Sequence, residues 1–546
     1  MECKKASMSL AVALGLALLA TNANAQRQRE VVVSTPLQAM PLTGGVYWIS
    51  GGAGANSGFV IGAKGVVVID AKMTADSAKA MLAEIAKVTP KPVTHVILTH
   101  SDGDHVNGLM GFPKNLTIIA HENCKNEMKE VLDAMGPAAP PALAGLRDYL
   151  PTQTVTKSQD LTIDGLRLRL LHFANGHTSG DLIVYLPTQK ILFGGDLFPA
   201  PNRFPLIHTE KHGSPEGWIA NIKGAVALHA ATYVPGHGDV QTEATLEKSL
   251  EYASSRQKEV ARLFAQGKSL TEVKQAVGEK DNPEFGAQAS FTQIAYRELS
   301  AKQTFDPHDL NGFWRARGSA LPTNQRHDIS LSAPPMTAWA QAKYDAAKPG
   351  LNGTGQGRAQ PLGNDPIMIC DPVGYPRIIA ASGDYGLQIV QAPKETLMLF
   401  DWFYARRDIY TDGRKLSPDT DMRFYGNSVG HWEGDTFVVE SNNFDARTWL
   451  DSAGHPHSDD MTLVERYRRV DHDTIELTMT LTDPKAYTTP WVSEKKYLER
   501  FFQDELESRN SGWNDLREDV CVPDVESRYR EEVREPAGGA KPASQQ

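Results

Sequence analysis

One short segment restricts the fold of this chain more than any other: Thr99-His100-Ser101-Asp102-Gly103-Asp104-His105. It follows directly on Val93–Leu98, a largely apolar stretch with the pattern of a buried strand. Four of its side chains can bind a metal, and they fall within six residues. Because Gly103 lets the chain turn, a loop at the end of a strand can bring these donors to one point. The segment therefore predicts a metal-binding loop containing His100, Asp102, Asp104 and His105.

Three further motifs lie downstream, each near the end of an apolar strand and each beside a glycine. They are Gly176-His177-Thr178, Gly194-Gly195-Asp196 and Pro235-Gly236-His237-Gly238. A single histidine at a strand end is usually a hydrogen-bonded polar residue, but an ordered set of this kind is improbable by chance. We therefore take His177, Asp196 and His237 as further candidate ligands.

The segments between these motifs alternate between strand and helix. A helix capped by Thr74 carries apolar residues at helical spacing until Pro90 ends it, and mostly helical patterns follow His237 as far as about residue 299. This alternation predicts an α/β layer architecture. Residues 125–155 contain four prolines, and we expect them to form a surface excursion rather than core. Other strands are predicted at 46–49, 58–61, 65–70, 116–120, 166–171, 182–186 and 191–193.

The residue pattern changes beyond about Phe305, where polar loops separate segments with strand periodicity. In Thr474–Leu481 apolar and polar residues alternate, which is typical of a strand with one buried face. Asp412-Gly413 and Glu433-Gly434-Asp435 lie between such segments and are expected to be hairpin turns. The second half is thus predicted to be a mostly antiparallel β domain, either a barrel or a sandwich.

The N-terminus has the pattern of an export signal. Lys4 and Lys5 precede an apolar run at 8–20, and Ala23-Asn24-Ala25 offers the small residues that signal peptidase accepts, so we expect cleavage before Gln26. The run is too short for a permanent membrane span. The expected location is therefore the periplasm or the medium.

The charge of the chain indicates its class of partner, and its cysteine content indicates which residues form a disulfide. The 56 Lys and Arg against 66 Asp and Glu give a net charge of −10 without a basic block, which argues against a nucleic-acid partner and favours a small-molecule substrate. Cys3 leaves with the signal, and an odd number of cysteines then remains in an oxidising compartment. Cys370 and Cys521 lie in the same half of the chain and are the expected disulfide, with Cys124 as a free thiol.

Taken as a set, the motifs resemble those of the metallo-β-lactamase superfamily over roughly residues 30–265, including Asp70 after the third strand. The resemblance implies an αββα sandwich that carries a dinuclear metal site at its strand ends. The second half resembles an uncharacterised β domain of exported bacterial proteins, which brings no activity with it. The expected domains are a signal peptide at 1–25, a catalytic domain with C-terminal helices at 26–304, a β-rich domain at 305–535 and a disordered tail at 536–546.

The resemblance also implies which residues hold each metal ion. The first ion would be held by His100, Asp102 and His177 with Asp196 bridging, and the second by Asp104, His105, Asp196 and His237. This chain has Asp102 where the family pattern, His-x-His-x-Asp-His, has its second histidine. Because the Asp102 carboxylate adds a hard oxygen ligand, it stays open whether a metal ion fills the first site. Two zinc ions are expected, with iron or manganese as alternatives.

Such a site predicts a metal-dependent hydrolase. Two cations lower the pKa of a bridging water, and the resulting hydroxide would attack the acyl bond of a small ester, lactone, amide or β-lactam. By the resemblance, Asp104 would orient the hydroxide and carry a proton to the leaving group, while Asp70 would hold the metal loop.

Two alternatives stay open. Asp102 suggests an iron-containing oxidoreductase of the same superfamily, and the third possibility is a binding protein whose metal domain is vestigial. In any of these cases the β domain would shape access to the site or bind a protein partner. Pro199 stands three residues after Asp196, where a quorum-signal lactonase of this superfamily often has a tyrosine, which weakens the lactonase interpretation.

The remaining histidines near the motifs lack metal-ligand spacing, and we expect structural roles for them. Among them His208 is the best placed for a contact, because it follows the expected substrate-rim segment at 198–207. They are His95, His121, His172, His208, His212 and His229.

Overall fold

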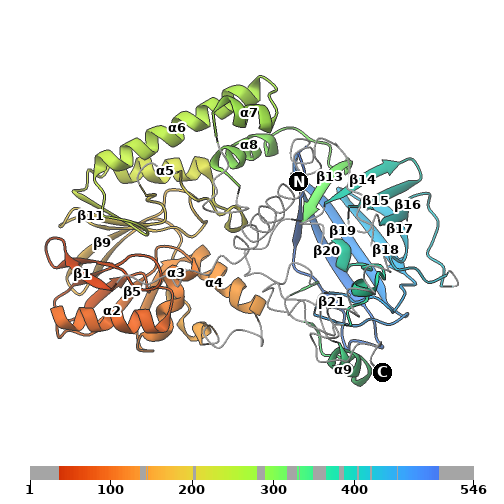
Figure 1. Cartoon of the computed structure of the whole chain (residues 1–546), viewed down its shortest axis with the longest axis horizontal. Coiled ribbons are helices and arrows are strands. Elements are labelled where there is room, and N and C mark those ends of the chain that lie inside the picture. The colour runs from red at the N-terminus through yellow and green to blue at the C-terminus, as the bar shows by residue number, and fades with distance from the viewer. Residues whose placement is uncertain are drawn as a thin grey trace, which may run out of the picture.

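The computed structural model describes residues 36–502, apart from 136–142, 144, 201–203, 280–288, 317–328, 331–332, 348–363, 380–385, 402–404, 419–420 and 452. The predicted signal peptide, the predicted disordered tail and Cys521 lie outside the described residues. Figure 1 shows two bodies, a layered α/β part from the first half of the chain and a β-rich part from the second.

The first sheet has the order β1-β2-β3-β4-β5-β6-β7, antiparallel as far as β4 and parallel from β4 to β7. Its strands are β1 (Gln38–Pro41), β2 (Val46–Ser50), β3 (Ser57–Ile61), β4 (Val66–Ile69), β5 (Val93–Ile97), β6 (Thr117–His121) and β7 (Gln153–Val155).

The second sheet has the order β12-β11-β10-β9-β8, in which β11 and β12 are parallel and the other pairs are antiparallel. Its strands are β8 (Gln159–Ile163), β9 (Leu166–Leu171), β10 (Ile183–Leu186), β11 (Ile191–Gly195) and β12 (Thr232–Pro235).

The two sheets pack face to face, and helices cover both outer faces. Along β4, Val67 and Ile69 join the core between the sheets, whereas Val66 and Val68 join the core beneath the helices, as the period of two requires. The α2 and α4 helices cover the first sheet, and α5, α6 and α8 cover the second (Figure 1). This arrangement confirms the predicted αββα sandwich. The helices are α2 (Ala75–Val88), α3 (Gly103–Val106), α4 (Glu122–Met135), α5 (Pro215–Val226), α6 (Glu243–Ala265), α7 (Leu270–Ala276) and α8 (Phe291–Ala301).

Residues 125–155 differ from the prediction. They were expected at the surface, but α4, a 3-10 turn at Leu146–Tyr149 and β7 pack onto the first sheet. Leu132 and Leu146 are buried in the core beneath the helices. Pro137, Pro140 and Pro141 lie outside the described residues, and Pro151 follows the 3-10 turn, so these prolines do not interrupt the described elements.

The second half of the chain forms a closed barrel. Among the described strands, nine follow one another in the order β19-β18-β17-β16-β15-β14-β13-β22-β20, and the pairing of β19 with β20 closes the circle while β21 adds to β20. Barrel is therefore the correct choice between the two predicted β architectures. Its strands are β13 (Gly312–Ala316), β14 (Leu387–Ala392), β15 (Glu395–Phe400), β16 (Arg406–Tyr410), β17 (Asn427–Glu433), β18 (Thr436–Asn442), β19 (Thr462–Asp471), β20 (Thr474–Thr482), β21 (Trp491–Val492) and β22 (Lys496–Arg500), and α9 (Ala338–Ala346) lies in a connection.

Of the two predicted hairpin turns, one is right. Gly434-Asp435 joins β17 to β18, with Glu433 opposite Thr436. At Asp412-Gly413 the prediction is wrong, because β16 and β17 pair in parallel and cannot be joined by a tight turn.

The remaining features of the fold are its cysteines, the absence of a described membrane-spanning helix and the contact between α8 and the barrel. Cys370 is disulfide-bonded, whereas Cys124 is free and buried. Among the described residues no helix has the length and apolar character needed to cross a membrane. The α8 helix contacts the barrel, where the Arg297 guanidinium donates to the Arg500 carbonyl at 3.2 Å and lies over the Phe502 ring.

Candidate metal centre

The predicted ligands all lie at one edge of the sandwich. The carboxyl ends of parallel strands meet at the same edge of a sheet, which is where α/β proteins place their sites. The His100 loop follows β5, Asp196 follows β11 and His237 follows β12, while His177 lies in the loop between β9 and β10. Sheet topology therefore brings together motifs that are separated by as much as 137 residues, from His100 to His237.

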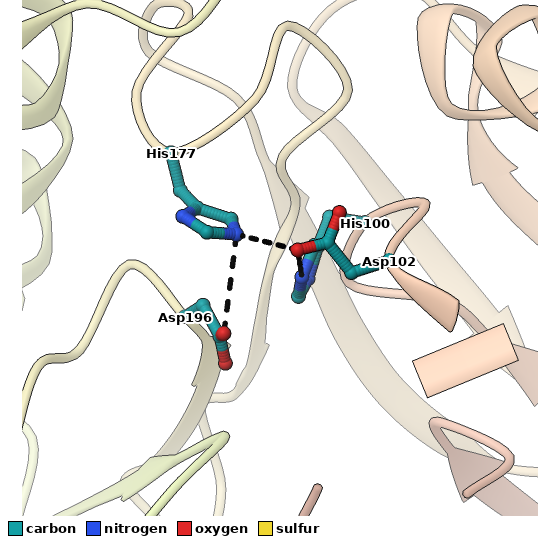
Figure 2. Close-up of side chains that lie close together, drawn as sticks. All are labelled: His100, Asp102, His177 and Asp196. Atoms are coloured by element: carbon teal, nitrogen blue, oxygen red, sulfur yellow. Dashed lines mark hydrogen bonds and ion pairs between the residues drawn. The ribbon is translucent and has the colours of Figure 1, made fainter. Parts of the chain in front are cut away.

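One group consists of His100, Asp102, His177 and Asp196, each offering a ligand atom within 4.8 Å of the others. Figure 2 shows His177 descending from its loop toward Asp102, with Asp196 below it. The Asp102 Oδ2 atom is 3.1 Å from His177 Nε2 and 3.5 Å from His100 Nε2.

A second group consists of Asp104, His105 and His237. Here Asp104 Oδ2 lies 3.1 Å from His237 Nε2. Asp196 stands between the groups, since its Oδ1 is 3.2 Å from His105 Nε2 and its Oδ2 is 3.4 Å from His237 Nε2 and 3.9 Å from His177 Nε2. The seven predicted ligands thus form two adjoining groups that share one carboxylate.

Unsatisfied buried atoms show that this donor set fits divalent cations. Among the described residues, His100 Nε2, His105 Nε2 and Asp196 Oδ1 are buried without a well-aligned hydrogen bond, although His105 Nε2 and Asp196 Oδ1 lie 3.2 Å apart. Such atoms are costly in a folded protein unless something binds them. Two of the imidazoles are also held through their other nitrogen: His105 Nδ1 by Asp70 at 2.8 Å and His177 Nδ1 by the Leu206 carbonyl at 2.8 Å. That leaves Nε2 directed at the centre, as in metal-binding histidines.

The carboxylates of the centre remain ionised. Burial alone would raise the pKa of Asp102, but His100, His177 and His208 lower it well below its usual value. Burial likewise opposes ionisation of Asp196, and the adjacent His105 and His237 lower its pKa well below the usual value. Hydrogen bonds to Asp104 and Asp196 raise the pKa of His237 to about 10. The centre therefore offers anionic oxygens that attract cations.

Asp70 and Gly236 fix the shape of the centre. Asp70 accepts hydrogen bonds from the Thr99 amide at 2.8 Å, the Thr99 hydroxyl at 2.7 Å and His105 Nδ1. A Cβ atom on Gly236 would stand 2.0 Å from Asp196 Oδ1, so only glycine allows β12 to approach the shared carboxylate.

Two residues that hold the ligand loops in place, Asp181 and Glu127, were not identified from the sequence. Asp181 accepts from the Gly176 and Thr178 amides and so holds the His177 loop, and burial raises its pKa to about 7. Glu127 on α4 accepts from Ser101 at 2.5 Å and from Ser179 at 2.7 Å, which joins the two ligand loops. For Asp181 a signal exists, because it closes a Gly-His-Thr-Ser-Gly-Asp run; nothing near Glu127 distinguishes it from a surface glutamate.

Comparison with known proteins agrees with this geometry. Residues 50–237 match the family model described as the metallo-beta-lactamase superfamily. The chain is 25% identical over 211 residues to a linear primary-alkylsulfatase of a Pseudomonas species, an alignment that covers 32% of this chain and 40% of that protein. It is 27% identical over 207 residues to the metallo-beta-lactamase type 2 of Bacillus cereus, covering 37% of this chain and 75% of that protein. The chain thus spans well under two thirds of the alkylsulfatase.

Two solved structures are similar to part of this chain. The stereoselective inverting sec-alkylsulfatase Pisa1 from Pseudomonas sp. has a TM-score of 0.40 and 18% identity, covering 50% of this chain and 52% of that one. The metallo-beta-lactamase from Pontibacter korlensis has a TM-score of 0.32 and 21% identity, covering 40% of this chain and 99% of that one.

Proposed function

We propose that this chain, whose residues 50–237 match the metallo-beta-lactamase superfamily, is a metal-dependent hydrolase that cleaves an acyl bond of a small molecule. One observation carries the proposal: two groups of His and Asp ligands share Asp196, and three of their buried polar atoms make no well-aligned hydrogen bond to any described residue. The similarity to proteins named for sulfatase and β-lactamase activity supports hydrolysis.

The centre suits two divalent ions, held by His100, Asp102 and His177 on one side and by Asp104, His105 and His237 on the other. We propose zinc, because imidazole and carboxylate ligands in this proportion suit it. Bound there, such ions supply Lewis acidity and lower the pKa of water.

Asp104 is the residue placed to move a proton. Its side chain is 25% exposed, against 13% for Asp196 and 15% for Asp102, so it reaches the open side of the centre. Its Oδ2 is positioned by His237 Nε2. We assign to Asp104 the orientation of the attacking water and the delivery of its proton to the leaving group.

A second candidate reaction is hydrolysis of a sulfate ester, which the similarity to the alkylsulfatase favours. Both reactions need an oriented water and a cationic environment for the developing negative charge. The assay must therefore offer both bond types side by side.

The test combines metal analysis with a substrate panel of acyl esters, homoserine lactones, β-lactams and alkyl sulfates. We expect two divalent ions per chain and hydrolysis of an acyl substrate, with kcat reduced by at least about 100-fold in Asp196→Ala and His237→Ala. His229→Ala is the control, since this exposed histidine pairs with Glu243 outside the centre.

Each alternative has its own result. Bound iron with oxygen consumption and no hydrolysis would replace the hydrolase with an oxidoreductase. Turnover of alkyl sulfates alone would replace the acyl bond with a sulfate ester. A cellular phenotype unchanged by Asp196→Ala would point to a binding protein whose metal domain is vestigial.

We further propose export to the periplasm or the medium. The support is the N-terminal pattern of Lys4, Lys5, an apolar run and Ala23-Asn24-Ala25. Cell fractionation and N-terminal sequencing test it: the expected mature protein begins at Gln26 and is absent from the cytosol.

A further inference from the structure

His208 lies over the first ligand group. Its Nε2 is 3.2 Å from Asp102 Oδ2, the same oxygen that is 3.1 Å from His177 Nε2 and 3.5 Å from His100 Nε2. The rings of His177 and His208 meet edge to face with 4.7 Å between centroids. Three imidazole nitrogens from three chain segments thus surround one carboxylate oxygen.

The other nitrogen of His208 is held in the same way as those of the predicted ligands. Its Nδ1 bonds Glu210 Oε1 at 2.5 Å, as His105 Nδ1 bonds Asp70 at 2.8 Å. A carboxylate on one nitrogen fixes the ring orientation and directs the other nitrogen inward, which is the usual support of a metal-binding histidine.

The backbone places His208 firmly beside the His177 loop. Its amide donates to the His177 carbonyl at 2.9 Å, and its own carbonyl accepts from the Gly213 amide at 2.8 Å. The His208 side chain is only 14% exposed. Its position at the centre therefore follows from the fold and does not depend on a side chain that swings in from the surface.

Asp102 and Lys211 explain why an additional imidazole belongs here. The Lys211 ammonium bonds Asp102 Oδ1 and the Ser101 hydroxyl, which turns Asp102 Oδ2 toward the three imidazoles. An aspartate neutralised by a lysine carries the same net charge as a neutral imidazole. The pair thus matches the charge of the histidine that the family pattern has at this position, but it does not supply its nitrogen.

We propose that His208 is a metal ligand of the first group, where it supplies the third imidazole that Asp102 lacks. The first group then consists of His100, His177 and His208 with the Asp102 carboxylate, and with Asp196 shared. Three imidazoles suit zinc, whereas manganese prefers sites made of oxygen ligands. The inference rests on the metal centre proposed above.

X-ray absorption of the zinc-loaded wild-type protein tests this directly, because imidazole carbons give scattering features that count the rings per ion. We expect five imidazoles shared by two zinc ions, from His100, His105, His177, His208 and His237. Four imidazoles shared by two ions would overturn the assignment of His208 and leave the hydrolase intact. No bound metal at all would overturn the proposed function itself.

A matched pair of variants gives a second measurement that does not depend on turnover. In His208→Phe, competition with a chelator should show one of the two ions held at least about tenfold more weakly. His229→Phe is the control, because His229 also pairs its Nδ1 with a glutamate but is 77% exposed. Unchanged retention of both ions in His208→Phe would contradict the proposal. Melting of both metal-free variants establishes that they are folded.

Discussion

The histidines of the sandwich differ in the group that binds their Nδ1 atom and in whether their Nε2 atom faces the metal centre. Where Nδ1 is held and Nε2 faces the centre, as in His105 and His177, the ring is ready to bind a cation. His121 differs, because its ring stacks on that of His172 with 4.2 Å between centroids and its Nδ1 accepts from the Asn123 amide. Sequence spacing already set His121 apart from the candidate ligands, and its partners agree with that prediction.

The low pKa of His121 predicts that the protein loses stability in mild acid. Burial, with a further contribution from His172, lowers its pKa from 6.5 to about 4. Between these values the unfolded chain takes up a proton that the folded chain does not, so the free energy of unfolding falls as the pH drops from 6.5 to 4. We expect this site to contribute about 1–2 kcal/mol of that fall after solvent screening.

Urea unfolding of wild type and His121→Asn at pH 6.5 and 4.5 measures this contribution. In the native protein His121 Nδ1 accepts a hydrogen bond from the Asn123 amide. The side-chain oxygen of asparagine can accept the same hydrogen bond. The variant should lose less stability than wild type over this range. Equal losses in the two proteins would remove His121 as the cause.

The α5 helix links the metal centre to the second sheet. It begins after Ser214, whose hydroxyl accepts from the Gly217 amide at 3.1 Å. Its first turn packs against the His177 loop so closely that a Cβ on Gly217 would stand 1.7 Å from the Asn175 carbonyl oxygen. The position of one ligand loop is therefore set by a helix that carries no ligand.

Gly217→Ala should destabilise the protein by about 1–3 kcal/mol, because the backbone of Asn175 must move away from the new methyl group. The displaced His177 should weaken retention of one metal ion. Thermal unfolding and chelator competition measure the two effects.

The matched control is Gly224→Ala in the same helix. There the new atom meets the Phe173 ring, which is 43% exposed and can turn aside, and alanine is the better helix former by about 0.5–1 kcal/mol. We expect a change in stability within about 1 kcal/mol and no loss of metal. Equal effects of the two substitutions would show that the contact with Asn175 is unimportant.

At the scale of the whole molecule, the sandwich and the barrel have separate cores. The barrel core runs from Leu310 to Leu498 and includes no described residue of the sandwich. At its centre the buried Arg407 guanidinium forms an ion pair with Glu465, and its carbon atom lies 3.8 Å from the centroid of the Tyr375 ring. The Tyr375 and Tyr467 hydroxyls donate to the same glutamate.

Arg407→Leu should destabilise the barrel by about 3–5 kcal/mol, because it leaves Glu465 buried without its cation. Replacing both residues, Arg407→Leu with Glu465→Leu, should recover most of that loss. Urea unfolding measures the stability, and metal content measured on the folded protein should stay at the wild-type value. Loss of metal in the single variant would show that the two cores depend on each other.

The sequence by itself predicted an α/β layer architecture and seven candidate ligands, because their information is local, whereas the sandwich was implied by the family resemblance. Apolar periodicity marks strands such as Val93–Ile97, and each ligand stands within a short motif beside a glycine. The same locality explains the errors at 125–155 and at Asp412-Gly413, where the partner strand decides the structure.

Only the tertiary structure decided which other residues join the centre. His208, Lys211 and Glu127 come from segments whose sequences carry no ligand spacing, and they become neighbours of the centre because the two sheets end at one edge. The closure of the barrel is also a long-range event, since it depends on β13 pairing with β22 across more than 180 residues. Such contacts depend on topology, and periodicity within a single segment does not encode it.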